Sequence, residues 1–231
     1  MGFGFSVDPD VIGFNKHAEA GLSPIRSPEE AFVEPKYEIL HNPLTEEYYE
    51  LKDWVTADEI TFTRQGYTGL QDEVLMPYNY LELFGHTLLG RPVIEVGEEY
   101  RAEREDHYRS PKRELAATVL QQIGHANGFE PEIYRMNINL TKCTKAARSI
   151  IHRDHDFDHW NLIIYLSTFH GGRTYVDNEP CPEPKEDLIV TFEGKDTLHW
   201  HEPPEGIDDN RFILVATYMP REIDSLERHL G

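Results

Sequence analysis

Apolar residues recur at helical spacing in the first half of the chain. Between Thr45 and Ile60 they fall at positions that a helix places on one face: Tyr48, Leu51, Trp54 and Val55. The Thr45 hydroxyl can cap the first turn, with glutamate following. A second stripe predicts a helix from about Ser110 to Asn127, which Gly128 ends. Its apolar positions are Leu115, Val119 and Ile123. We expect this second helix to pack against a sheet.

After Gly128 the pattern changes to short runs rich in β-branched and aromatic residues, separated by Gly, Pro and Asp. The runs are YRMNINL, LIIYLST, RTYVDN, DLIVTFE and RFILVATYM. Such runs are typical of strands. Because no helix separates the last four, they predict a sandwich or barrel and not alternating βαβ units.

The chain of 231 residues is long enough for one β domain with added helices. We therefore expect a single domain over 1–231. Residues 1–128 would form an N-terminal arm and supporting helices, and 129–222 a β core. Four prolines in about the first 35 residues favour an extended arm there.

The net charge of −20 makes binding to nucleic acid improbable. It favours a cationic or neutral small molecule or peptide side chain as the partner. No apolar run approaches the ~20 residues of a membrane span, and no secretory signal is recognisable. The two cysteines, Cys143 and Cys181, fit a reducing compartment, although a single disulfide between them stays open. We expect a cytoplasmic protein that binds no membrane, and its oligomeric state is open.

The densest group of potential metal ligands is the segment IHRDHDFDHW at 151–160. In an extended segment, residues i and i+2 point to the same side, so His152 and Asp154 can converge on one ion. A third ligand is available from His199 or His201, which follow the run DLIVTFE. Two histidines and one carboxylate are the ligands of non-haem Fe(II) oxygenases, which keep three coordination positions open. The other histidines and aspartates of 151–160 are expected to orient ligands or to form the loop.

The order of these features is more specific than any one of them. A His-x-Asp pair, a strand, Gly171-Gly172, another strand, a distal histidine and Arg211 follow one another in HRDHDFDHWNLIIYLSTFHGGRTYV and EDLIVTFEGKDTLHWHEPPEGIDDNRFILVATYM. Over about the last two-fifths of the chain, this set resembles the iron(II)- and 2-oxoglutarate-dependent oxygenases. The compact prolyl-hydroxylase-like and small phage or bacterial members are the most similar.

The resemblance implies a mainly β fold with flanking α-helices, namely a double-stranded β-helix (jelly roll). It implies Fe(II), 2-oxoglutarate and O2 as cofactor and cosubstrates, and His152 and Asp154 as two metal ligands. The third ligand is His199 by its distance to Pro203, whereas the distance to Arg211 suits His201 better. We favour His199.

Arg211 falls on the position where the family binds the distal carboxylate of 2-oxoglutarate. Many relatives place a hydroxyl residue two positions later, but here that residue is Ile213, so the hydroxyl must come from elsewhere. By resemblance, Tyr165 and Asn139 also contact the cosubstrate. The paired glycines are expected to permit a tight turn and a close backbone approach.

The implied function is an Fe(II)- and 2-oxoglutarate-dependent dioxygenase that hydroxylates a small molecule or peptide side chain and releases succinate and CO2. Two alternatives stay open: a zinc-dependent hydrolase that uses the same ligands, and a cupin-like binding module without activity. The substrate is not predicted, nor are the roles of 1–128, although the segment Met76–Gly90 is expected to build the substrate side of the pocket.

Overall fold

The computed structural model describes residues 35–57, 60–64, 81–91, 110–144 and 148–223. All of them belong to one compact unit, Pro35–Gly231. The extended arm that we expected in about the first 35 residues lies almost entirely outside the described residues, as do Met76–Tyr80 of the expected pocket segment.

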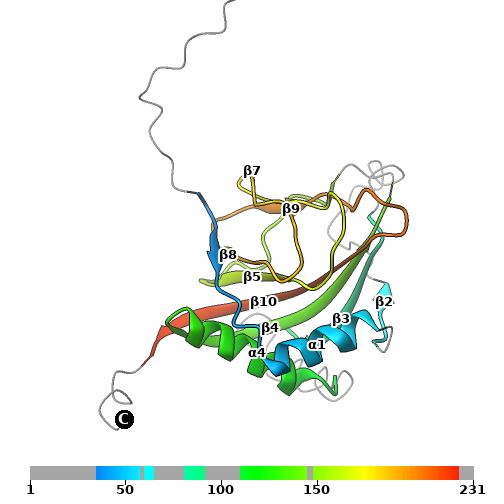
Figure 1. Cartoon of the computed structure of the whole chain (residues 1–231). Coiled ribbons are helices and arrows are strands. Elements are labelled where there is room, and N and C mark those ends of the chain that lie inside the picture. Colours follow the sequence, from blue (N-terminus) through cyan, green and yellow to red (C-terminus); the bar gives the residue numbers. More distant parts are fainter. Residues whose placement is uncertain (1–34, 58–59, 65–80, 92–109, 145–147, 224–231) are drawn as a thin grey trace, which may run out of the picture. The chain divides into compact units, whose positions relative to one another are not determined.

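Within these residues, seven strands form a large antiparallel sheet (Figure 1). From one edge to the other they are β1 (Glu38–Leu40), β8 (Ile189–Glu193), β5 (Trp160–Tyr165), β10 (Asn210–Glu222), β4 (Phe129–Lys142), β3 (Leu83–Leu89) and β2 (Thr63–Arg64). A small antiparallel sheet contains β7 (Glu179–Pro180), β6 (Thr174–Val176) and β9 (His199–His201). The prediction of a mainly β protein with flanking helices is confirmed.

The two faces of the large sheet are buried against different partners, because side chains alternate along each strand. On one face the apolar residues pack with α1 (Glu46–Thr56) and α4 (Arg113–Ala126). Figure 1 shows these two helices side by side on the outside of the sheet. On the other face, Ile163, Ile213 and Val190 form a second cluster with Val176 of the small sheet. The space between the two sheets is where a ligand can bind.

Both predicted helices are present, with ends a few residues from those expected. Thr45 caps α1 by accepting a hydrogen bond from the Tyr48 amide at 3.2 Å. The buried positions of α1 are the predicted ones: Tyr48, Leu51, Trp54 and Val55. In α4 the buried stripe includes Val119 and Ile123, while Leu115 is only partly buried. Gly128 follows the helix with φ = 86°, a conformation that favours glycine.

Five strands are absent from the expectations, namely β1, β2, β3, β7 and β9, and two of them matter for the cavity. β3 lies in the sequence LELFGHTLLG, whose apolar spacing is irregular, and it pairs with β4 in the large sheet. β9 has only three residues, His-Trp-His, and pairs with β6. Neither shows regular alternation, and short strands of this kind depend on tertiary pairing more than on local preference.

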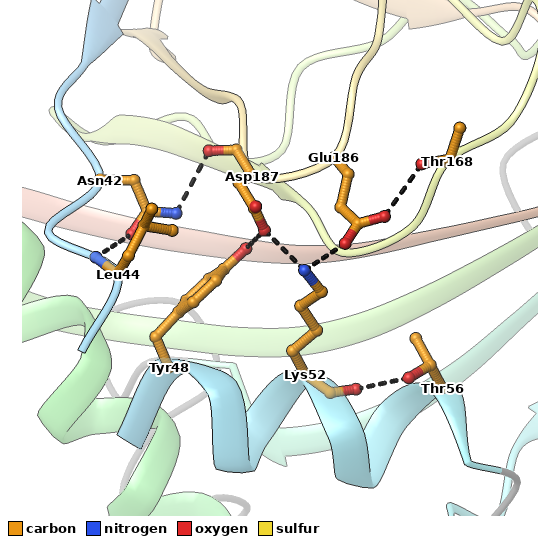
Figure 2. A network of polar contacts seen from close by, with 8 residues as sticks. All are labelled: Asn42, Leu44, Tyr48, Lys52, Thr56, Thr168, Glu186 and Asp187. Atoms are coloured by element: carbon orange, nitrogen blue, oxygen red, sulfur yellow. Dashed lines mark hydrogen bonds and ion pairs between the residues drawn. The ribbon is translucent and has the colours of Figure 1, made fainter. Parts of the chain in front are cut away.

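A polar network fastens α1 to the segment that leads into β8 (Figure 2). Lys52 forms ion pairs with Glu186 and, at 2.9 Å, with Asp187. The Tyr48 hydroxyl donates to the same Asp187 carboxylate at 2.7 Å, and burial raises the pKa of that phenol. Because α1 covers the outer face of the sheet, this network holds helix and sheet edge together without contributing to the inner face.

The disulfide that the sequence left open does not form, since both cysteines are free thiols. No helix within the described residues is long and apolar enough to span a membrane.

Candidate metal centre

Two backbone hydrogen bonds bring His152 beside His199. The His152 amide donates to the His199 carbonyl at 3.1 Å, and the His199 amide donates back at 2.9 Å. This isolated bridge joins a loop before β5 to the short strand β9. The imidazole rings follow the backbone, and their centroids lie 4.4 Å apart. A local pairing therefore brings together two histidines that are 47 positions apart in the sequence.

Asp154 completes the group from two residues further along. Its Oδ1 lies 3.9 Å from His152 Nε2, and its Oδ2 lies 3.7 Å from His199 Nε2. One ligand atom from each of the three residues falls within 4.8 Å of the others. These separations suit a single ion at about 2.0–2.2 Å from each donor atom. Two imidazoles and one carboxylate form the donor set typical of non-haem Fe(II).

Asp154 and His199 have the protonation states that a cation site requires. Burial raises the pKa of Asp154, but His199, Arg135 and His152 together lower it further, so the net shift is downward and the carboxylate stays ionised. Burial lowers the pKa of His199 to about 4. A neutral imidazole has a lone pair available for a metal, so both residues are in their ligating forms at neutral pH.

The tautomer of His152 is also suitable. Its Nδ1 lies 2.9 Å from the Ile150 carbonyl, so Nδ1 carries the proton and Nε2 faces Asp154 with a free lone pair. The Nδ1 of His199 is buried and has no hydrogen-bond partner among the described residues. The residues present therefore fit a metal ion bound through the two Nε2 atoms and the carboxylate.

His201 lies on the same strand but belongs to a different part of the cavity. Its Nε2 is 3.5 Å from the Thr141 hydroxyl, and its backbone pairs with Ser149. His201 is not in the group whose ligand atoms converge. Of the two histidines that the sequence left open, the geometry favours His199.

The other polar residues of 151–160 surround the group. Asp156 and Asp158 are exposed, and Asp158 pairs with Lys195 at 2.6 Å. His155 and His159 are buried and cluster with Phe157: their ring centroids lie 4.9 Å and 5.3 Å from the Phe157 ring and 5.1 Å from each other. None of these four is in the convergent group.

The three residues line a cavity of about 430 Å³. Its wall includes residues of β4, β5 and β10 from the large sheet and of β6 and β9 from the small sheet. Apolar side chains, among them Ile163, Ile213 and Phe192, form much of the surface. The cavity thus lies between the two sheets and has the size and mixed lining of a small-molecule site.

Arg211 lies in this cavity wall with only 1% of its surface exposed. Its Nε donates to the Gly172 carbonyl at 3.0 Å, and its Nη2 donates to the Thr174 hydroxyl at 3.0 Å. The Tyr165 ring lies beneath the guanidinium, 5.5 Å from its carbon, and the Tyr165 hydroxyl is 2.8 Å from that of Thr174. A buried cation of this kind, already oriented, suits a carboxylate of the ligand.

Gly172 has the structural role that its sequence suggested. Its φ is 65°, and a Cβ there would lie 2.7 Å from Phe169 and 3.2 Å from Cδ of Arg211. Glycine is therefore required for the backbone to approach the guanidinium.

Asn139 lies on β4 and lines the cavity, where its Oδ1 accepts a hydrogen bond from Asn137. Thr174 was not among the expected residues, and its hydroxyl lies beside the Arg211 guanidinium. The signal for it was weak: an inward position of the short run RTYV, two residues after Gly172.

No family model and no curated protein sequence matches the chain. Among solved structures, it is similar to a prolyl hydroxylase from Trichoplax adhaerens, in complex with a hypoxia inducible factor oxygen degradation domain peptide fragment. That similarity has 13% identity, covers 85% of this chain and 87% of the other, and has a TM-score of 0.51. SnoK, a non-heme alpha ketoglutarate dependent carbocyclase from nogalamycin biosynthesis, gives 11% identity, the same coverages and a TM-score of 0.51.

These similarities extend over most of the described chain and beyond the segments that carry the sequence motifs. The chain has the double-stranded β-helix fold of these non-haem oxygenases, and the jelly-roll prediction is confirmed. A His-Asp-His group is present between its sheets. At identities this low, the comparison establishes the fold, and the activity has to be argued from the site.

Proposed function

We propose that this protein is an Fe(II)- and 2-oxoglutarate-dependent dioxygenase that hydroxylates a small molecule or a peptide side chain. The observation that carries the proposal is the convergence of His152, Asp154 and His199 within 4.8 Å, in a cavity that also contains the buried Arg211. The fold is one on which such oxygenases are built.

In this proposal His152, Asp154 and His199 hold Fe(II) and leave coordination positions open for cosubstrate and O2. When bound, Fe(II) with 2-oxoglutarate and O2 supplies the oxidising power for hydroxylation, and succinate and CO2 are released. The chain itself ligates the metal, orients the cosubstrate and excludes water.

Arg211 binds the distal carboxylate of 2-oxoglutarate. Its guanidinium is held by the Gly172 carbonyl and the Thr174 hydroxyl, so little freedom is lost when the anion binds. The hydroxyls of Tyr165 and Thr174, 2.8 Å apart, are the neutral donors beside it. Asn139, further along the same wall, is an additional cosubstrate contact.

The test is an anaerobic titration of metal-free protein with Fe(II) and then 2-oxoglutarate. We expect the visible charge-transfer band of a cosubstrate chelated to iron. Asp154→Ala should lose the band, and Asp156→Ala, an exposed carboxylate two residues away, should keep it. Absence of the band in the unmodified protein, or its survival in Asp154→Ala, would contradict the proposal.

The same titration tests the choice of distal histidine. His199→Ala should lose Fe(II) binding, and His201→Ala should retain it, because of these two histidines it is His199 that faces Asp154. The opposite result would assign the metal to His201.

A further inference from the structure

The cavity differs in charge from the chain that contains it. The whole chain carries a net charge of −20. Among the described residues that line the cavity, however, there are three arginines, Arg91, Arg135 and Arg211, and one carboxylate, Asp154. A ligand responds to the charges that it contacts more than to the distant surface, because surface charges are screened within about 10 Å. The cavity therefore favours anions, contrary to what the net charge indicated.

One arginine already has a function in the proposed mechanism, since Arg211 binds the cosubstrate. A second, Arg135, is on β4 beside the metal ligands, with Nη1 3.5 Å from Oδ1 of Asp154. Its side chain is 25% exposed, so it is accessible from the cavity. When Asp154 ligates a divalent cation, the carboxylate is shared between two positive groups. The cation and Arg135 then repel each other unless another anion binds nearby.

Arg135 belongs to a row of polar side chains that crosses three strands. Thr217 of β10 is paired with Arg135 of β4 on one side and with Asn161 of β5 on the other. Side chains at paired positions of neighbouring strands lie about 4.5–5.5 Å apart on the same face. All three line the cavity. Since Thr217 and Arg211 are six positions apart on β10, this row is about 20 Å along the strand from the cosubstrate arginine.

Asn161 provides the second observation. Only 4% of this residue is exposed. Neither its Oδ1 nor its Nδ2 has a hydrogen-bond partner within the described part of the chain. A buried carboxamide without partners destabilises the folded state, so such groups are rare without a compensating role. A ligand in the cavity would satisfy both atoms: the nitrogen donates to an anionic oxygen, and the oxygen accepts from an N–H or O–H of the ligand.

We propose that Arg135 and Asn161 form a binding site for the primary substrate, which carries a carboxylate with a neighbouring N–H or O–H group. Arg135 binds the carboxylate next to the metal ligands, and Asn161 binds both the carboxylate and the neighbouring donor. The apolar strip of Ile163 and Val215, between this row and Arg211, contacts the body of the substrate. The inference rests on the proposed oxygenase function, because it assumes that 2-oxoglutarate occupies Arg211.

The test uses matched probes that differ only in charge: N-acetylglycine, N-acetylvaline and N-acetylphenylalanine, each as the acid and as the primary amide. They are titrated calorimetrically into the full chain loaded anaerobically with Fe(II) and saturating 2-oxoglutarate. We expect at least one acid to bind with 1:1 stoichiometry, about tenfold or more tightly than its amide.

Three variants connect the preference to the named residues. Arg135→Met keeps the length of the side chain and should abolish the preference for the acid, whereas Arg135→Lys should keep part of it. Asn161→Leu should weaken binding of the same acid. Arg221→Met is the control, because it removes one positive charge from an exposed residue that pairs with Glu132 and does not line the cavity. It should leave the preference unchanged.

Equal binding of acid and amide, binding of none of the acids, or a preference that survives Arg135→Met would overturn the inference. The charge-transfer band separates these failures from failure of the oxygenase proposal. If the band appears but acids and amides bind equally, the oxygenase proposal stands and the carboxylate site is wrong. If the protein shows no band but prefers acids, and this preference depends on Arg135, the carboxylate site stands and the oxygenase proposal is wrong.

Discussion

The Thr174 hydroxyl accepts a hydrogen bond from Nη2 of Arg211 at 3.0 Å. This bond joins β6 of the small sheet to β10 of the large sheet. The same hydroxyl lies 2.8 Å from that of Tyr165, so one small side chain orients two of the groups assigned to 2-oxoglutarate. The cosubstrate end of the cavity is thus assembled by contact between the two sheets.

Thr174→Val keeps the shape of the side chain and removes its hydroxyl. We expect the dissociation constant of 2-oxoglutarate to rise about tenfold, because the guanidinium loses one of the hydrogen bonds that orient it. Stability should fall by about 1–3 kcal/mol, since the buried bonds of Thr174 are lost. Calorimetry with 2-oxoglutarate and urea denaturation check the two effects.

Thr168→Val is the matched control, because Thr168 is exposed and its hydroxyl donates to Glu186, which does not line the cavity. It should leave cosubstrate binding unchanged. Unaltered 2-oxoglutarate affinity in Thr174→Val would show that Arg211 does not need this anchor.

The proposed metal ligands could be predicted because two of them are close in sequence. His152 and Asp154 are two positions apart in an extended segment, so their convergence follows from backbone geometry alone. The prediction of His199 required the family resemblance, since the approach of His199 to His152 depends on a backbone bridge between distant segments. The strands of the core could be predicted for a similar local reason, their β-branched runs.

Thr174 and Asn161 could not be predicted. Thr174 matters because the small sheet places its hydroxyl over Arg211, and no local pattern encodes that distance. Asn161 has the sequence context of any buried strand residue. What distinguishes it is the lack of hydrogen-bond partners among the described residues, and that property exists only in three dimensions.

Arg135 should oppose metal binding in the absence of an anion. Its guanidinium is 3.5 Å from the Asp154 carboxylate, close enough to repel a divalent ion bound there. We expect Arg135→Met to bind Fe(II) or Zn(II) about threefold to tenfold more tightly than the unmodified protein when no other ligand is present. Competition with a chromogenic chelator at low ionic strength measures the difference.

Arg153→Met is a suitable comparison, because this exposed neighbour of both ligands bonds to the Lys195 carbonyl instead. Its effect on metal affinity should be smaller. Weaker metal binding in Arg135→Met would mean that Arg135 supports the geometry of Asp154 more than it repels the ion.

The stability of the metal-free protein should depend on pH through its buried histidines. Burial lowers the pKa of His199 from 6.5 to about 4, and it lowers that of His201 well below 6.5. Between about pH 4 and about pH 6.5 the unfolded chain therefore binds more protons than the folded chain, so the free energy of unfolding rises with pH. The contribution of these neutral imidazoles to the free energy of unfolding is complete above about pH 6.5 and is lost as the pH falls towards about 4.

Urea denaturation in the presence of a chelator, at about pH 7 and about pH 5, should therefore give a free energy of unfolding that is lower at the acidic value by about 1–3 kcal/mol. His201→Gln should reduce this difference. His170→Gln, which alters a histidine whose side chain is 82% exposed, should not. Equal stability at both pH values would mean that these imidazoles are not buried as neutral groups.

Asn161→Leu should make the protein more stable while it weakens substrate binding. The substitution replaces a carboxamide that is 4% exposed and has no partner among the described residues with an apolar side chain of similar size. Removing the unsatisfied group should raise the free energy of unfolding by about 1–2 kcal/mol, measured by urea denaturation of the metal-free protein.

Asn137→Leu is the contrasting variant. Asn137 is also buried, at 2% exposure, but its amide donates to the Ile138 carbonyl at 3.2 Å and to Asn139. Its replacement should lower stability, because Asn139 loses a bonded neighbour. If both leucine variants lose stability, Asn161 contributes to the fold itself. If only Asn161→Leu gains stability, the protein keeps a destabilising group in its interior, as expected for a residue retained to bind a ligand.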